Sequence, residues 1–398
     1  MDYSSKFSEK VKYLEGSAIR EMFKLMAKPE IISFAGGSPD SALFPNEELA
    51  EIAAEILKNN GAAALQYGIT EGYEPLRNWV VDRLKKQGVI SDNDDTIIVS
   101  GGQQGIDLAA KSLLNEGDGV ICETPSFVGG LNCFKAYNAK LYGVKVDDDG
   151  INIEELESVL KEHSNVKILY TIATFQNPSG ITVSLEKRKK VIELAEKYDI
   201  VIFEDNPYGE LRFSGEPVPT LKSLDKYDRV VYFGSFSKIL SPGMRIGHAS
   251  CNSELMKRMV ICKQVQDVHT PVLTQMMAYE FVTRYSIDEH IAKISKIYGE
   301  KCKLMMSLMD EYFPDCVKHT VPEGGLFLFC TMPEGIDTKE FLKKAIEKNI
   351  AFVPGATTMI DQTKVYSSFR MNYSMASKEQ IEKGVKILAD VLNKELSR

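Results

Sequence analysis

The sequence contains no run of about 18 apolar residues, the length that a membrane-spanning helix requires. It also has no excess of positive charge, because 48 lysine and arginine residues stand against 56 aspartate and glutamate residues and give a formal net charge of −8. A surface that binds nucleic acid needs a basic excess. The sequence therefore predicts neither a membrane anchor nor a nucleic-acid interface.

Cysteine and histidine are both sparse. Seven cysteines occur, an odd number with no C-x-x-C pair, so neither a disulfide framework nor a zinc ribbon is predicted. The five histidines show no spacing typical of metal ligands, and we predict no metal site. Residues 1–10 are polar and mixed in charge, without the apolar core of a signal peptide. We therefore expect a cytoplasmic protein.

The composition is otherwise that of a globular chain, since 44% of the 398 residues are hydrophobic and 26% are charged. In the middle of the chain, short apolar runs rich in β-branched residues alternate with segments of helical spacing such as 185–198. This alternation predicts an α/β fold with a mostly parallel sheet between helices. The runs are mostly apolar and do not alternate with polar residues, as expected of strands buried on both faces. They cover residues 96–100, 119–123, 166–172, 200–203 and 230–233.

The pattern changes after residue 250, where helical segments are followed by a mixed region. Helices are predicted over 253–265, 274–284, 287–312 and 378–396, and short strands near 326–330 and 367–372. Glycines and prolines interrupt the first 45 residues. We therefore predict an N-terminal arm over 1–45 that packs with the small domain, a large domain over 46–285, and a small α+β domain over 286–398.

Ligands of an open α/β sheet bind beyond the carboxyl ends of its strands. The first predicted strand is followed by Gly101, Gly102 and Gln103 and then by a helical segment. Free N–H groups at the start of a helix favour an anion, so this turn is a candidate phosphate site. It is neither a G-x-G-x-x-G nor a Walker A motif, which gives no support to dinucleotide or nucleotide binding. A plain strand-to-helix turn is the alternative interpretation.

A lysine, Lys238, lies just past the last of these strands, in the sequence Ser-Phe-Ser-Lys. A lysine above the crevice can form a Schiff base with a carbonyl compound if its pKa is lowered. The neighbouring Ser235 and Ser237, with Arg245 downstream, could hold a phosphate. A solvated loop with ordinary charges is the alternative.

Two further strand ends carry Asp205 with Tyr208, and Asn177 before Pro178. A carboxylate at the end of an apolar strand is costly to bury unless a cation faces it, and a pyridinium nitrogen would be such a cation. Helix capping by Asp205 and turn formation by Asn177 are the plainer alternatives. Taken together, the four strand ends offer partners for the phosphate, the ring nitrogen, the phenolic oxygen and the aldehyde of pyridoxal phosphate.

The segment 235–247, SFSKILSPGMRIG, resembles the class I/II aminotransferases of PLP fold type I. The resemblance extends from residue 17 to Arg370 and is closest to the 2-aminoadipate and kynurenine aminotransferases and the aminotransferase-like domains of MocR regulators. It implies a homodimer that moves an amino group between an L-amino acid and a 2-oxo acid by a ping-pong mechanism. Glutamate and 2-oxoglutarate are the implied first pair, with an aminoadipate, aromatic or branched-chain substrate as the second.

The same resemblance implies a role for each matching residue. Lys238 matches the Schiff-base lysine, and Asp205 matches the carboxylate that pairs with the pyridine nitrogen. Asn177 and Tyr208 match the donors to the ring hydroxyl oxygen, and Phe127 matches the aromatic ring stacked on the cofactor. The phosphate-binding positions match Gly102, Gln103, Ser235, Ser237 and Arg245.

The remaining matches concern the substrate and a second subunit. Arg370 matches the arginine that binds the substrate α-carboxylate, with Asn177 beside it, and Arg20 and Gly37 match an N-terminal element above the substrate. Tyr67 matches a tyrosine that reaches the phosphate of the neighbouring subunit. Arg370 could instead be structural, and Arg20 could be a surface contact.

Two other functions stay open at this point. A PLP-dependent carbon–sulfur β-lyase on the same fold needs the same cofactor contacts, so the motifs do not separate it from an aminotransferase. A ligand-sensing regulator is the second, because MocR proteins carry this fold behind a DNA-binding winged helix. The chain is acidic, and its aminotransferase pattern begins near residue 17, which leaves no room for such a helix.

Overall fold

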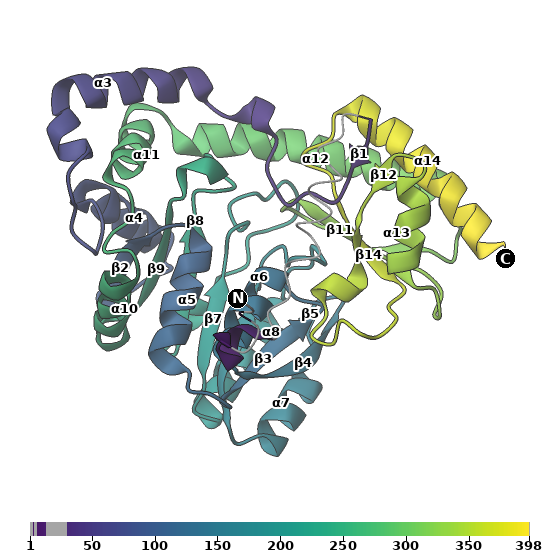
Figure 1. Ribbon diagram of the computed structural model, residues 1–398, viewed down its shortest axis with the longest axis horizontal. Coiled ribbons are helices and arrows are strands. Elements are labelled where there is room, and N and C mark those ends of the chain that lie inside the picture. The colour runs from purple at the N-terminus through teal and green to yellow at the C-terminus, as the bar shows by residue number, and fades with distance from the viewer. Residues whose placement is uncertain (1–2, 4–5, 13–29, 398) are drawn as a thin grey trace.

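The computed structural model describes residues 3, 6–12 and 30–397. An eight-stranded sheet with the order β2-β9-β8-β7-β6-β3-β4-β5 forms the larger part, and helices flank it (Figure 1). Its strands are β2 (Asp94–Val99), β3 (Gly119–Thr124), β4 (Lys140–Asp147), β5 (Gly150–Ile151), β6 (Val166–Thr171), β7 (Val201–Asp205), β8 (Val230–Ser235) and β9 (Gly247–Asn252).

The five predicted strands are confirmed as β2, β3, β6, β7 and β8, with ends that differ by one or two residues. Strands β8, β7, β6, β3 and β4 pair in parallel, whereas β9 runs antiparallel to both of its neighbours, β2 and β8. Two successive reversals leave β2 pointing the same way as β8. The carboxyl ends of β2, β8, β7 and β6 therefore meet at one edge of the sheet, which is what positions the site.

The helices around this sheet follow the apolar periodicity of the chain. Helix α5 packs against β8 and β9 and against two neighbouring helices, α6 and α10, while α8 packs against α7 and α9. The helices are α1 (Glu9–Lys12), α3 (Asn46–Ala64), α4 (Glu74–Lys86), α5 (Gly102–Leu113), α6 (Val128–Lys135), α7 (Ile153–Glu162), α8 (Leu185–Lys197), α9 (Leu221–Leu224), α10 (Ser253–Gln266) and α11 (Val272–Arg284), with 3-10 turns η2 (Ser41–Leu43) and η3 (Pro242–Met244).

Helix α12 (Ile287–Tyr312) runs along the top of the view in Figure 1, from the large sheet to a second, four-stranded sheet. This sheet has the order β10-β11-β14-β13 and is antiparallel. Its strands are β10 (Lys318–His319), β11 (Phe327–Thr331), β13 (Val353–Pro354) and β14 (Ser368–Asn372). The same part of the chain forms α13 (Thr338–Ile346), α14 (Lys378–Leu396) and the 3-10 turn η4 (Gly355–Thr358).

The α/β fold with a smaller α+β part is thus as predicted. A short strand near the N-terminus, β1 (Ile32–Ser33), pairs with β12 (Ile350–Ala351) beside the second sheet. The division of the chain at residues 45 and 285 stays a proposal. None of the helices within the described residues is long and apolar enough to cross a membrane.

Candidate functional site

A cavity of about 400 Å³ opens at the carboxyl edge of the large sheet. Gly102 follows β2, Asn177 follows β6, Asp205 ends β7 and Ser235 ends β8, while Arg370 reaches the cavity from β14. The lining includes the predicted site residues Gly37, Gly102, Gln103, Phe127, Asn177, Asp205, Tyr208, Ser235, Ser237, Lys238, Arg245 and Arg370.

Two predicted residues are not among them. Tyr67 does not line the cavity of its own chain; it is 82% exposed, and its ring meets His269 edge-on at 5.8 Å between centroids. Arg20 lies outside the described residues.

At the end of the cavity near the start of α5, a glycine makes room for the side chain of Arg245. Gly101 has φ +82°, and a Cβ there would lie 2.3 Å from Nη2 of Arg245. Without that carbon, the guanidinium reaches the start of α5 and donates to the carbonyl oxygen of Ser100 at 3.0 Å. The positive charge of Arg245 therefore adds to the free N–H groups of the helix N-terminus, and together they favour an anion such as a phosphate.

Asp205 is the buried carboxylate of the cavity, with 5% of the residue exposed. The hydroxyl of Tyr170 donates to its Oδ2 at 2.8 Å. Burial raises the pKa of Asp205 to about 7, against the opposing effects of the Tyr170 hydrogen bond and the charge of Lys238. A cation against this carboxylate would stabilise its ionised form.

Lys238 donates from Nζ to the carbonyl oxygen of Gly37 at 2.7 Å. Burial, together with the positive charges of Arg370 and Arg245, lowers the pKa of this amine to about 8, and Asp205 opposes the shift. An amine with such a pKa loses its proton readily near neutral pH, which makes it a candidate nucleophile and base.

Arg370 heads a chain of polar contacts across the cavity. Its Nη1 donates to Oδ1 of Asn177 at 2.8 Å, and Nδ2 of Asn177 donates to the hydroxyl of Tyr208 at 3.2 Å. Nη2 donates to the carbonyl oxygen of Ala35 at 2.8 Å, and the guanidinium carbon lies 4.3 Å from the ring centroid of Phe327. Burial lowers its pKa to about 10, so the group stays charged at neutral pH. Its fixed, charged fork suits a carboxylate.

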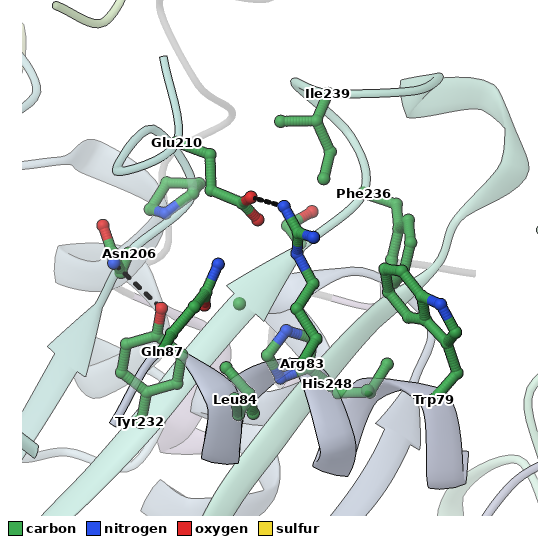
Figure 2. Close-up of a pocket in the computed structure, with 14 residues that line it drawn as sticks. Trp79, Arg83, Leu84, Gln87, Asn206, Glu210, Tyr232, Phe236, Ile239 and His248 are labelled. Atoms are coloured by element: carbon green, nitrogen blue, oxygen red, sulfur yellow. Dashed lines mark hydrogen bonds and ion pairs between the residues drawn. The ribbon is translucent and has the colours of Figure 1, made fainter. Parts of the chain in front are cut away.

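A much smaller cavity, of about 30 Å³, lies behind the strand ends (Figure 2). It shares the lining residues Pro207 and Ser235 with the larger one. Figure 2 shows Asn206 bonded to Tyr232 and Arg83 paired with Glu210 around it. This volume holds about one water molecule, so the small cavity is too small for an organic ligand. The paired side chains around it support the wall of the larger cavity.

Several neighbours of the cavity were not predicted. Tyr170 is one, although strand alternation gives a signal for it: Ile172 lines the cavity, and a residue two positions earlier lies on the same face of the strand. The carbonyl of Ala35 and the ring of Phe327 are others. They contact Arg370 from distant parts of the chain, and no local pattern marks them.

The contents of the cavity fit the pyridoxal phosphate that the resemblance implies. Arg245 and the start of α5 suit its phosphate, the buried Asp205 suits a protonated ring nitrogen, and the amine of Lys238 suits an aldehyde. In addition, Nε of the buried Arg370 has no hydrogen-bond partner within residues 30–397. Over the described part of the chain, no group of three or more histidine, cysteine, aspartate or glutamate side chains could hold a metal ion.

Comparison with known proteins agrees with this chemistry. The aromatic-amino-acid aminotransferase 1 of Thermococcus litoralis is 41% identical over 403 residues, which cover 100% of this chain and 96% of the relative. The structure of Pyrococcus horikoshii kynurenine aminotransferase with PMP has a TM-score of 0.95 at 40% identity and covers 99% of this chain and 98% of that one.

The α-aminoadipate aminotransferase of Thermus thermophilus, complexed with N-(5′-phosphopyridoxyl)-L-leucine, has a TM-score of 0.92 at 34% identity over 100% of both chains. A family model described as aminotransferase class I and II matches residues 29–388. Because that match spans most of the sequence, the chain belongs to the class I and II aminotransferases, and its cofactor is pyridoxal 5′-phosphate.

Proposed function

We propose that the protein moves an amino group between an L-amino acid and a 2-oxo acid by a ping-pong mechanism, with glutamate and 2-oxoglutarate as one pair. The observation that carries the proposal is the shared cavity of Lys238, Asp205 and Arg370. It places an amine of lowered pKa, a buried carboxylate and a carboxylate-binding fork around one space.

When bound, pyridoxal phosphate supplies an aldehyde that can carry an amino group and a ring that accepts electrons from the substrate. Asp205 would pair with its ring nitrogen and keep that nitrogen protonated. Asn177 and Tyr208, which already share a hydrogen bond, would donate to its ring oxygen. Phe127, at the start of α6, would stack on the ring face.

The phosphate would lie at the start of α5. The backbone of Gly102 and the side chains of Arg245 and Gln103 border this end of the cavity. Ser235 ends β8 and Ser237 follows it, and Oγ of Ser235 accepts from the backbone N–H of Ser237 at 3.0 Å. Their hydroxyl hydrogens would then point to the phosphate.

Two side chains would act on the substrate directly. Arg370 would hold the α-carboxylate through paired hydrogen bonds, with Asn177 fixing the angle of the guanidinium. Nζ of Lys238, whose pKa is lowered, would remove the proton on the substrate α-carbon and hold it as a general base. Gly37, whose carbonyl oxygen bonds this Nζ, would border the substrate together with Arg20.

The second substrate pair would be an aminoadipate, aromatic or branched-chain amino acid. The relatives named for aromatic amino acids, kynurenine and α-aminoadipate support this range. A panel of these amino acids, each with 2-oxoglutarate as acceptor, would rank them by kcat/KM.

The test is a half-reaction. The PLP-loaded protein is mixed with L-glutamate in the absence of any acceptor. Release of about one equivalent of 2-oxoglutarate per subunit supports both the glutamate pair and the ping-pong order, in which the first product leaves before the second substrate binds. If oxo acid forms only when an acceptor is present, the ping-pong order is wrong. Pyruvate and ammonia released from cystathionine without an acceptor would instead favour the β-lyase.

We also propose that a second copy of the chain completes the site. Exposed apolar side chains of Leu65, Tyr67, Ile69, Val265 and Val268 occur in segments that meet where Tyr67 contacts His269. Exposed apolar side chains grouped in this way are typical of an interface. In the dimer, Tyr67 would reach the phosphate of the neighbouring subunit. The cytoplasmic location stays a prediction from the sequence.

A further inference from the structure

Tyr170, on β6, is a fully buried residue that does not line the cavity. Its hydroxyl donates to Oδ2 of Asp205 at 2.8 Å, and this is its one hydrogen bond to the described residues. Its ring packs edge-on against Phe134, with 5.4 Å between centroids. The phenol is therefore held in one orientation, in which its hydroxyl donates a hydrogen bond to Asp205.

The space for this phenol depends on a glycine of the neighbouring helix. A Cβ on Gly130 of α6 would lie 2.7 Å from Cε1 of Tyr170 and 3.1 Å from its hydroxyl oxygen. Any other residue at 130 would displace the ring. Gly130 thus provides the space that the ring of Tyr170 occupies beside α6.

The two oxygens of Asp205 have different surroundings. Oδ2 accepts from Tyr170, whereas Oδ1 has no partner within the described residues and lies 3.9 Å from where a Cβ on Gly102 would be. Oδ1 is thus the oxygen toward the cavity. A partial rotation of the carboxylate would break the bond to Tyr170, so that bond fixes the orientation in which the carboxylate presents its other oxygen to a ligand.

The charge of Asp205 also needs support from within the protein. Glu123 is buried nearby, and its charge adds to burial in raising the pKa of Asp205. Glu123 has donors of its own, the hydroxyl of Thr171, the backbone N–H of Ile172 and the amide of Gln176. Burial raises the pKa of Tyr170 well above its usual value, so the phenol stays a donor to Asp205.

We propose that Tyr170 is a positioning residue for Asp205: its phenol holds one carboxylate oxygen so that the other, ionised, faces the ring nitrogen of pyridoxal phosphate. The inference rests on the proposed role of Asp205. Tyr170 touches neither cofactor nor substrate, and it acts through the carboxylate.

The test compares Tyr170→Phe with a matched control, Tyr137→Phe. Tyr137 also donates its phenol to a carboxylate, Oδ1 of Asp107 at 2.9 Å, and does not line the cavity. The first readout is the dissociation constant of PLP from the apoprotein, measured by titration of the visible absorption. We expect Tyr170→Phe to weaken PLP binding about tenfold, the effect of one hydrogen bond to a charged group. Tyr137→Phe should change it by less than about twofold.

A double-mutant cycle with Asp205→Asn makes the test specific. If Tyr170 acts through Asp205, Tyr170→Phe has no further effect on PLP affinity in the Asp205→Asn background. Equal effects in both backgrounds would overturn the inference, as would unchanged affinity in the single variant. Failure of the wild-type protein to bind PLP through Lys238 would instead overturn the proposed function.

A measurement on the wild-type protein covers the case in which Tyr170→Phe does not fold. Neutron diffraction of the deuterated PLP complex locates the deuterons directly. The inference expects one on the Tyr170 hydroxyl, directed to Oδ2 of Asp205, and one on the ring nitrogen. A deuteron on Asp205 itself would overturn it.

Discussion

Replacement of Lys238 by methionine should stabilise the apoprotein at neutral pH while abolishing turnover. The amine is buried beside Arg370 and Arg245, and these surroundings lower its pKa from the ordinary 10.5 to about 8. Below pH 8 the amine is charged in both the folded and the unfolded state, so folding bears the full cost of burying the charge. At about 1.4 kcal/mol per pH unit, that cost is about 3 kcal/mol.

Methionine removes the charge but keeps most of the side-chain volume. It also removes the hydrogen bond from Nζ to the carbonyl oxygen of Gly37, which offsets about 1–2 kcal/mol of the gain. The expected net effect at pH 7 is therefore about 1–2 kcal/mol in favour of the variant. Between pH 8 and 10.5 the unfolded wild type binds a proton that the folded protein does not, so wild-type stability rises with pH and the advantage of the variant shrinks.

The assay is urea unfolding of both apoproteins at pH 7 and near pH 10, with turnover of the PLP-loaded forms measured in parallel. A variant that is less stable at pH 7, or whose advantage does not change with pH, would refute the argument that the amine is buried at a cost. Turnover near the wild-type value would refute the catalytic role of Lys238.

Three other changes test the remaining parts of the site. Arg370→Lys loses the paired geometry for a carboxylate and should raise KM for the amino acid at least about tenfold, as measured by steady-state kinetics; an unchanged KM would make Arg370 a structural residue. Gly101→Ala places a Cβ against Nη2 of Arg245 at a left-handed φ, and it should weaken PLP binding about tenfold or more in an absorbance titration. Gly88→Ala is the control, because Gly88 also has a positive φ but its Cβ would lie in open space. Tyr67→Ala should be inactive alone, yet mixing it with inactive Lys238→Met should restore activity, because a mixed dimer has one intact site; no recovery on mixing counts against an intersubunit role.

The strands that carry the site were predictable because their sequences are apolar on both faces. Residues 166–172 and 230–233 show no alternation of polar and apolar side chains, and all of them except the half-buried Lys167 are buried near the centre of the sheet. Strand β9 was not predicted, since Gly247–Asn252 contains no β-branched run. It forms by backbone pairing with β2 and β8 on either side, and those partners lie far away in the sequence.

The same distinction separates the predicted from the unpredicted parts of the site. Asp205 ends a buried strand, and Lys238 and Asn177 follow buried strands within three and six residues, so their place at the sheet edge follows from the fold class. The contact of Arg370 with the carbonyl of Ala35 joins residues 335 positions apart and depends on how β14 packs against the N-terminal segment. The proposed role of Tyr67 needs a second chain, which no pattern within one sequence can supply.

The charges of the cavity explain why its residues lower the stability of the folded protein until ligands bind. Lys238, Arg245 and Arg370 bring three positive groups against the single carboxylate of Asp205. The mutual repulsion of these groups contributes to the lowered pKa of Lys238. A phosphate at Arg245 and a substrate carboxylate at Arg370 would each remove part of the excess, and a protonated ring nitrogen would satisfy Asp205. PLP should therefore raise the stability of the folded chain by an amount that grows with the logarithm of its affinity, and the positive excess would favour anionic substrates over neutral amines.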